Sequence, residues 1–108
     1  MDPRVAAALS LIQTQPQTTT EALAVSVNLF PSRLRHVFRA EMSTSLCRYV
    51  REWRLVHAEE LLRTTFLSIK QVSAGCGFRD PNHFRREFRR RFGLAPTAYR
   101  QVAGSDAK

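Results

Sequence analysis

Apolar residues recur at three- and four-residue spacing along nearly the whole chain, which is the spacing of one face of an α-helix. The clearest case is Phe84, Phe88 and Phe92, which lie every four residues between arginines. Asp80 can cap a helix at the start of this segment, and Gly93 can end it. The segment therefore predicts a short helix with an aromatic inner side and a cationic outer side.

The same spacing predicts about seven helices and no strand, so the expected fold class is all-α. The longest helix starts at Ser45 and ends near Arg63, and its ~19 residues would form a rod of roughly 28 Å. The inner side of this rod is expected to carry Leu46, Tyr49, Val50, Trp53, Val56 and Leu61. The other helices are expected at 4–15, 18–27, 31–42, from 68 to a turn at Gly77, at 81–92 and from 96.

Two helix starts have the residue spacing of a capping box, in which two side chains bond two otherwise unpaired backbone N–H groups. One pairs Thr18 with Glu21, and the other pairs Ser68 with Gln71. After the second helix, Asn28 suits a turn, because Asn tolerates a left-handed backbone better than most residues. These local signals predict two short helices, each followed by a turn and a longer helix.

The second half of the chain repeats the pattern of the first half, with offsets of 50 and 49 positions. The expected units are two helix-turn-helix subdomains at the ends of one long helix. The first set of matches, 50 positions apart, is Leu34, Phe38 and Met42 with Phe84, Phe88 and Phe92. The second set, 49 positions apart, is Leu23, Ala24 and Asn28 with Val72, Ser73 and Gly77. The predicted segments are a first subdomain at 1–44, a linker helix at 45–64, a second subdomain at 65–102 and a disordered tail at 103–108.

Composition and charge narrow the class of partner. Apolar residues make up 44% of the chain, which argues against a disordered protein. The formal net charge is +8 and the pI is about 11.0, so the expected partner is a polyanion. Of the 17 Lys and Arg residues only Lys70 and Lys108 are lysines, and arginine forms forked contacts to phosphate and guanine. The second helix of a helix-turn-helix unit, its recognition helix, can enter the major groove of DNA. Two such helices and the positive charge together favour double-stranded DNA as the partner.

The sequence predicts no cofactor, no metal site and no enzyme. Cys47 and Cys76 form no CxxC pair and have no His at ligand spacing, so both are expected to be reduced. A cysteine that accepts alkyl groups from DNA would need a cluster of zinc-binding cysteines, which is missing. No signal peptide and no apolar run near the ~20 residues that span a bilayer are present, so we expect a cytoplasmic protein without membrane contact.

Two stretches resemble the AraC/XylS family of transcription regulators. Residues 53–62 match a family pattern of Arg-Leu, Ala and Leu-Leu. The resemblance covers about residues 5–101 and is more specific in the second half. The matching positions there are Ser68, Ile69, Val72, Gly77, Phe78, Phe84, Phe88, Phe92, Gly93, Pro96, Tyr99 and Arg100.

The resemblance implies two helix-turn-helix subdomains joined by a long helix, sequence-specific DNA binding, and often activation through contact with RNA polymerase. Most family members carry a separate ligand-sensing or dimerising domain, for which this chain has no room. The chain is therefore similar to the compact MarA/SoxS-type members, which bind DNA as monomers, or it is the DNA-binding part of a longer regulator. Phe30, Ser43 and Ser73 depart from the family, which usually has a Ser cap, a Gly and an Ala there.

The positions that match the family's base-contacting residues lie on the two expected recognition helices. Arg35 and Arg86 could each donate a fork to guanine, and Asn82 could pair with adenine. Arg89 and Arg90 lie further along and are expected to meet phosphates. The full expected DNA-contacting set is Ser32, Arg33, Arg35, His36, Arg39, Pro81, Asn82, His83, Arg85, Arg86, Arg89 and Arg90.

Two functions therefore compete. The first is a transcription regulator, expected to be an activator, that binds DNA as a monomer. A rod of roughly 28 Å plus the helix radii can hold two recognition helices about one duplex turn (~34 Å) apart, so one chain could reach two major-groove segments. The second is a protein-interaction module of the same fold, which binds RNA polymerase or another regulator with little sequence-specific DNA binding. Phe30 and Ser43 permit the second function, because they weaken the first unit. A further alternative is non-specific coating of nucleic acid, driven by charge alone. The paired recognition helices argue against it, because a coating protein needs no such geometry.

Overall fold

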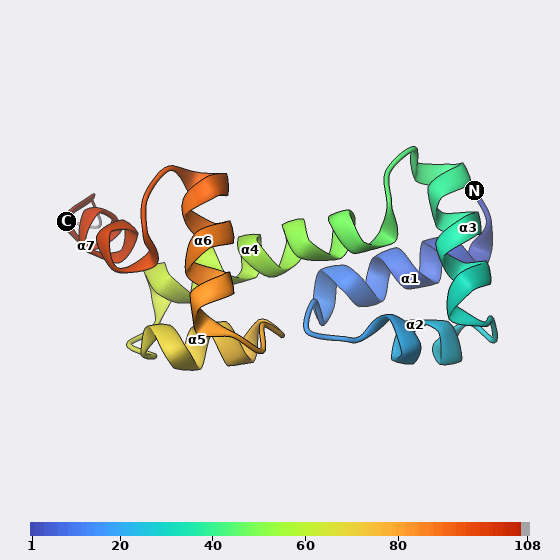
Figure 1. The fold of residues 1–108 in the computed structure, drawn as a ribbon, viewed down its shortest axis with the longest axis horizontal. Coiled ribbons are helices and arrows are strands. Elements are labelled where there is room, and N and C mark those ends of the chain that lie inside the picture. Colours follow the sequence, from blue (N-terminus) through green and yellow to red (C-terminus); the bar gives the residue numbers. More distant parts are fainter. Residues whose placement is uncertain (107–108) are drawn as a thin grey trace. The chain divides into compact units, whose positions relative to one another are not determined.

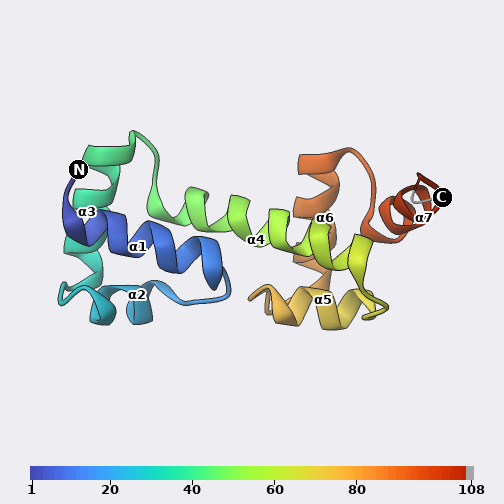
Figure 2. The same ribbon diagram turned by 180° about the vertical axis from the view of Figure 1, so that it is seen from behind.

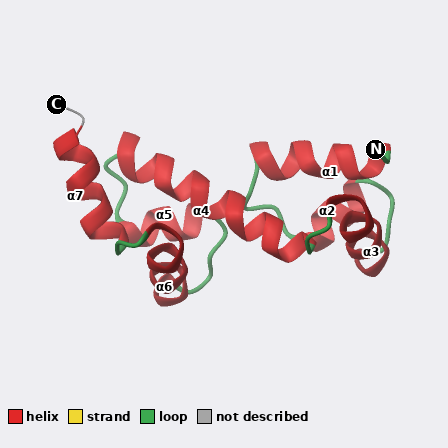
Figure 3. Cartoon of the chain, turned by 90° about the horizontal axis from the view of Figure 1, so that it is seen from above, coloured by secondary structure: helices red, strands yellow, loops and turns green. Residues whose placement is uncertain are grey.

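The computed structural model of the chain describes residues 1–106, and this part contains helices and no strand (Figure 3). The expected all-α fold class is confirmed. The last helix is longer than expected and overlaps the tail predicted at 103–108, of which 107 and 108 lie outside the described residues. The helices are α1 (Pro3–Thr14), α2 (Thr20–Ser26), α3 (Pro31–Met42), α4 (Leu46–Thr64), α5 (Ile69–Gly75), α6 (Pro81–Phe92) and α7 (Pro96–Asp106).

The chain divides into two compact units, Met1–Trp53 and Arg54–Lys108. The boundary falls inside α4, which the sequence analysis assigned as a linker. The first half of α4 packs into the core of the first unit, and its second half packs into the core of the second unit. The long helix is therefore a structural part of both helix-turn-helix units.

In the first unit, α3 stands across the ends of α1 and α2 (Figure 1). Seen from behind, α1 lies alongside the first half of α4, where Gln13 Nε2 donates a hydrogen bond to Tyr49 Oη at 3.3 Å (Figure 2). The enclosed core combines residues from all four helices. Its buried members are Val5, Ala8, Ile12, Leu23, Ala24, Val27, Leu34, Phe38, Leu46 and Val50.

In the second unit, aromatic rings on α6 form the centre of the core. The Phe88 ring lies 5.7 Å from Phe84 and 4.5 Å from Phe92, and Tyr99 on α7 meets it edge-on at 5.4 Å. Aromatic pairs at these distances add to the stabilisation from burial alone. The buried members of this core are Leu55, Ala58, Leu62, Val72, Cys76, Phe78, Phe84 and Phe88.

The repeat also includes α1 and the second half of α4. Buried residues of α1 have buried counterparts 50 positions later, on the second half of α4. The second half of α4 therefore supports the second unit as α1 supports the first. The matched pairs are Val5 with Leu55, Ala8 with Ala58, and Ile12 with Leu62.

The inner side predicted for α4 differs from the observed one in its second half. Leu61 packs against the second core, as predicted. Val56 is only partly buried, and the buried residues Leu55, Ala58 and Leu62 were not predicted. The prediction assumed that one side of the helix is buried along its whole length. At 3.6 residues per turn, the buried set of the second half does not continue the side that is buried in the first half.

Both helix-turn-helix turns contain a residue with a left-handed backbone. These residues are Asn28, with φ of 57°, and Gly77, with φ of 89°. The turn predicted at Asn28 is thus confirmed, and Gly77 occupies the matched place in the second unit. A further hydrogen bond closes each turn at 3.0 Å, from Leu29 N to Ala24 O and from Phe78 N to Ser73 O.

The helix starts agree with the prediction in the second unit and differ in the first. The capping box that begins at Ser68 is confirmed, with both of its hydrogen bonds present. The box predicted for Thr18 and Glu21 is wrong, because Thr19 is the cap and its Oγ1 accepts from Ala22 N at 3.1 Å. Since the helix starts one residue later than predicted, the third helical residue is an alanine, which cannot complete a box.

Side chains from α7 hold the end of α4 and the loop after it. Tyr99 Oη donates to Glu59 Oε2 at 2.7 Å. The Arg100 guanidinium donates to the carbonyl oxygens of Leu62 at 3.2 Å and Thr65 at 3.3 Å. The last carbonyls of a helix have no partner within the helix, so a cation at this place is stabilising. These bonds fix the loop from which α5 begins.

Candidate nucleic-acid interface

Each recognition helix is held by the large apolar residues on its inner side. In α6 these are Phe84 and Phe88, and in α3 they are Leu34 and Phe38, all fully buried. Burying one such side chain contributes roughly 1.5–3 kcal/mol. Because the inner side is fixed in this way, the opposite side of each helix presents its residues outward in a defined orientation.

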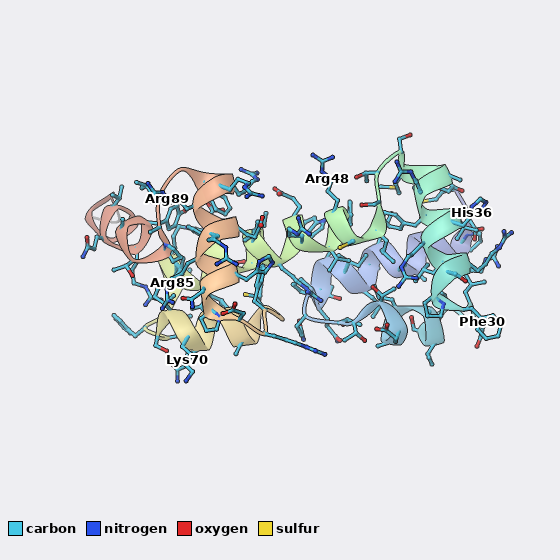
Figure 4. The ribbon with its side chains drawn as sticks, viewed as in Figure 1. Phe30, His36, Arg48, Lys70, Arg85 and Arg89 are labelled. Carbon is cyan, nitrogen blue, oxygen red and sulfur yellow. The ribbon has the colours of Figure 1, made fainter. Side chains whose placement is uncertain are left out.

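The outer face of α6 carries Asn82, Arg85, Arg86 and Arg89, all exposed. Figure 4 labels two of them, Arg85 and Arg89. The spacing of the four places them on one side of the helix, away from the buried phenylalanines. Arg85 Nη1 donates to Asn82 Oδ1 at 3.0 Å. This bond orients the Asn82 amide and occupies one of the two lone pairs of its oxygen, so the oxygen can still accept one bond and the amide N–H groups remain as donors.

The outer face of α3 has the same layout. Ser32, Arg35, His36 and Arg39 are all exposed, and their spacing places them on one side of the helix. His36 is labelled in Figure 4. Each of the four lies 50 positions before a residue of the α6 face. The pairs are Ser32 with Asn82, Arg35 with Arg85, His36 with Arg86, and Arg39 with Arg89. Eight of the twelve residues in the predicted set thus form two matched faces.

The other members of the predicted set lie at the edges of these faces. Arg33 is exposed, and Pro81 is half-buried as the first residue of α6. His83 is also half-buried, and its ring lies 6.0 Å from the ring of Phe78. Arg90 pairs with Glu87 at 3.5 Å, but its side chain stays 76% exposed. An ion pair so exposed contributes little to stability, so Arg90 can exchange it for a phosphate.

No acidic residue lies on either face within the described part of the chain. Glu41, near the end of α3, accepts a hydrogen bond from Asp2 N at 2.7 Å. In α6, Glu87 pairs with Arg90 and lies off the face. The two faces therefore carry cationic and neutral hydrogen-bonding groups and no carboxylate. Their donors include the guanidinium, amide and hydroxyl groups. Such donors bind phosphate oxygens and the acceptor atoms of base edges.

The two cysteines lie in different surroundings, one buried and one exposed. Burial raises the pKa of the Cys76 thiol to about 11, so this thiol is protonated at neutral pH. Cys47 is exposed, and both cysteines are free thiols. Over the same residues, no three His, Cys, Asp or Glu side chains gather where they could hold a metal ion. None of the described helices combines the length and apolar character needed to cross a membrane.

Three further residues have surroundings that could not be predicted from the sequence. Arg54 Nη1, on α4, donates to Gly77 O at 3.4 Å and so supports the turn before α6. Arg48 is exposed on the first half of α4 (Figure 4). Phe30 caps α3 without any side-chain hydrogen bond, and it is 82% exposed. Its departure from the family pattern was visible in the sequence, but its exposure is visible only in the structure.

Two helix-turn-helix units with matched cationic recognition helices define a class of DNA-binding proteins. A family of helix-turn-helix domains matches residues 23–102, and the chain belongs to the AraC family of transcription regulators. It is similar to the transcriptional regulator CdhR of Pseudomonas aeruginosa, with 37% identity over 82% of this chain and 26% of CdhR. It is also similar to the transcriptional activator RhaR of Pectobacterium atrosepticum, with 44% identity over 63% of this chain and 24% of RhaR. The chain thus spans about a quarter of the length of these relatives.

Solved structures have the same fold. The DNA-binding domain of AdpA, determined in complex with a target DNA, aligns with a TM-score of 0.80 and 27% identity over 98% of this chain and 96% of that domain. An AraC-type regulator from Chromobacterium violaceum aligns with a TM-score of 0.78 and 29% identity, covering 94% of this chain and 92% of that one. These relatives are regulators and not enzymes, in agreement with the prediction from the sequence.

Proposed function

We propose that this chain binds DNA sequence-specifically through both recognition helices, as the DNA-binding part of a transcription regulator. The observation that carries the proposal is the pair of matched faces on α3 and α6. Four outward positions recur with an offset of 50, and none of the eight residues is acidic. A packing role would require these residues to be buried, whereas all eight are exposed. Their recurrence in both units supports a shared binding function.

Individual roles follow from side-chain chemistry. Arg35 and Arg86 suit forked donation to guanine O6 and N7. The Asn82 amide suits adenine; because Arg85 already occupies its oxygen at 3.0 Å, pairing with adenine would have to share or replace that bond. Arg89 and Arg90, further along α6, suit phosphate oxygens, which position the protein without specifying sequence.

The relatives support a regulatory role. AdpA binds a target DNA through a domain that aligns with nearly all of this chain. RhaR is an activator, which favours activation and contact with RNA polymerase. We infer that the chain acts in the cytoplasm, where bacterial DNA lies. Because each unit brings its own recognition helix, we also infer that one copy of the chain occupies two successive major-groove segments.

Selection of bound duplexes from a random pool tests this function. We expect an enriched motif with two half-sites about one helical turn, ~10 base pairs, apart. Affinity for the motif should exceed affinity for scrambled DNA at every salt concentration, although both fall as salt rises. The proposal fails if no motif is enriched and the affinities for a recovered duplex and for scrambled DNA are equal at every salt concentration. Charge alone would then account for binding.

A second candidate function is protein interaction with little DNA specificity in the first unit. The observation in its favour is the pair Phe30 and Ser43, which leave α3 without a side-chain cap and end it with a left-handed serine. In that case only the half-site read by α6 would be enriched. Arg35→Ala would then leave DNA affinity unchanged, whereas Arg86→Ala would lower it.

A further inference from the structure

Phe30 neither caps α3 with its side chain nor buries its ring in the first core. Its side chain makes no capping hydrogen bond to α3, and its ring is 82% exposed. The matched residue 50 positions later is Asp80, whose Oδ1 accepts from Asn82 N at 3.0 Å. One unit therefore has a working cap at this position, and the other has an aromatic ring in solvent. An uncapped helix start is less stable than a capped one, so Phe30 contributes less to the start of α3 than Asp80 contributes to the start of α6.

The backbone that carries the Phe30 ring is held in a defined place, although the ring is exposed. Just before it, Leu29 is partly buried in the first core, and its N–H donates to Ala24 O at 3.0 Å. Just after it, Pro31 fixes the backbone at the first position of α3. The Phe30 backbone is extended, with φ of −71° and ψ of 150°. A residue whose backbone is already fixed loses less entropy on binding than one in a flexible segment.

The location favours DNA as the partner of this ring. Recognition helices place their N-terminal residues at base edges in the major groove. Phe30 sits at that end of α3, beside exposed Ser32 and Arg33 and within two turns of His36 (Figure 4). A cationic surface around an aromatic ring disfavours an apolar protein partner and suits a polyanion. The apolar group that base pairs present in the major groove is the methyl group of thymine.

We propose that Phe30 contacts a thymine methyl group in the half-site bound by α3, and so contributes to the sequence preference of the first unit. This inference rests on the proposed DNA-binding function. It makes a position outside the α3 face a determinant of specificity. It also gives the two half-sites different rules, because Asp80 cannot supply an apolar contact at the same place in the second unit.

Replacement of single thymines by deoxyuridine tests the contact, since uracil differs from thymine only by the missing methyl group. In the motif selected by the unaltered chain, we expect one thymine of the α3 half-site at which this replacement weakens binding about threefold to fivefold, as the loss of one buried methyl group would. Phe30→Ala and Phe30→Ser should bind the thymine and the uracil duplex equally. Phe66→Ala, which removes another fully exposed ring from the loop before α5, should keep the response of the unaltered chain.

The outcomes separate this inference from the function beneath it. If the unaltered chain and Phe30→Ala respond alike at every thymine, the Phe30 contact is overturned and the DNA-binding function stands. If selection enriches no motif, both proposals fail. Phe30→Ser restores a capping side chain, so its first unit remains folded. A missing uracil response in that variant therefore reports the ring and not a damaged helix.

Discussion

At the scale of single residues, the repeat allows one position to be compared in two units. Ser43 and Gly93, 50 positions apart, end α3 and α6 with left-handed φ values of 58° and 83°. A side chain destabilises this conformation by roughly 1–2 kcal/mol, because Cβ approaches the neighbouring carbonyl oxygen. The two units therefore end their recognition helices with the same backbone conformation but with different residues. The serine is the less stable of the two in this conformation.

Ser43→Gly should raise the free energy of unfolding by about 1 kcal/mol, because glycine removes this steric cost. Urea unfolding followed by circular dichroism measures the change. Gly93→Ala is the matched control and should lower stability. A Cβ at Gly93 would meet no atom within 4 Å, so the loss would reflect the backbone alone. A Ser43→Gly variant no more stable than the parent would contradict this account.

Ser73 offers a second comparison, since its partner in the repeat is Ala24. Both are fully buried, and the Ser73 hydroxyl has no hydrogen-bond partner among the described residues. A buried polar group without a partner destabilises the folded state by roughly 1–3 kcal/mol. Ser73→Ala should therefore raise the midpoint of urea unfolding, with a gain of about 1 kcal/mol. A loss of stability would mean that the hydroxyl is bonded in solution.

Cys76 makes stability depend on pH above neutrality. Burial raises the pKa of its thiol from 9.0 to about 11, so between these values the unfolded chain releases a proton that the folded chain keeps. Stability should therefore fall as pH rises from 9 to 11. In Cys76→Ala this fall should be shallower. The comparison uses the slope of stability against pH, so it holds even if the substitution changes stability at pH 8. Urea titrations across the range measure both slopes, and Cys47→Ala, at an exposed position, is the control. Equal slopes in all three proteins would refute the assignment.

At the scale of helices, local chemistry predicted most of the boundaries. The cap at Asp80, the box at Ser68 and the left-handed turn at Asn28 are all present, because each depends on residues within one turn. Thr18 and Thr19 could not be separated, since neighbouring threonines offer the same capping oxygen. The inner side of α4 could not be predicted from its own spacing. Which side is buried depends on the units packed against each half, and those contacts are not local.

The corrected inner side of α4 is testable by two adjacent substitutions. Leu55→Ala should lower the free energy of unfolding by about 2–4 kcal/mol, because it leaves a cavity in the second core. Val56→Ala should cost less than about 1 kcal/mol, because this side chain is only partly buried. Chemical unfolding of the two variants gives the comparison. The reverse order would restore the side predicted from the sequence.

At the scale of the whole molecule, the sequence predicted which residues of α3 and α6 point outward. It did not predict the distant hydrogen bonds that hold the surrounding loops in place. The exposed arginines of α3 and α6 could be placed by helical spacing, because their positions alternate with large apolar residues. The roles of Arg54 and Arg100 could not be predicted, since each bonds backbone carbonyls at least 20 positions away. The exposure of Phe30 was equally out of reach, because an apolar residue beside a helix is ordinarily expected to pack.

In the proposed complex, both recognition helices read bases, each through its own face. The most direct test is the affinity of the unaltered chain, Arg35→Ala and Arg86→Ala for the selected motif and for duplexes with one half-site scrambled. We expect each variant to lose roughly 1–3 kcal/mol on the full motif. Arg35→Ala should become insensitive to base changes in one half-site, and Arg86→Ala to changes in the other. If both variants lose affinity equally for motif and scrambled DNA, these arginines contact phosphate only, and the account of two base-reading helices is wrong.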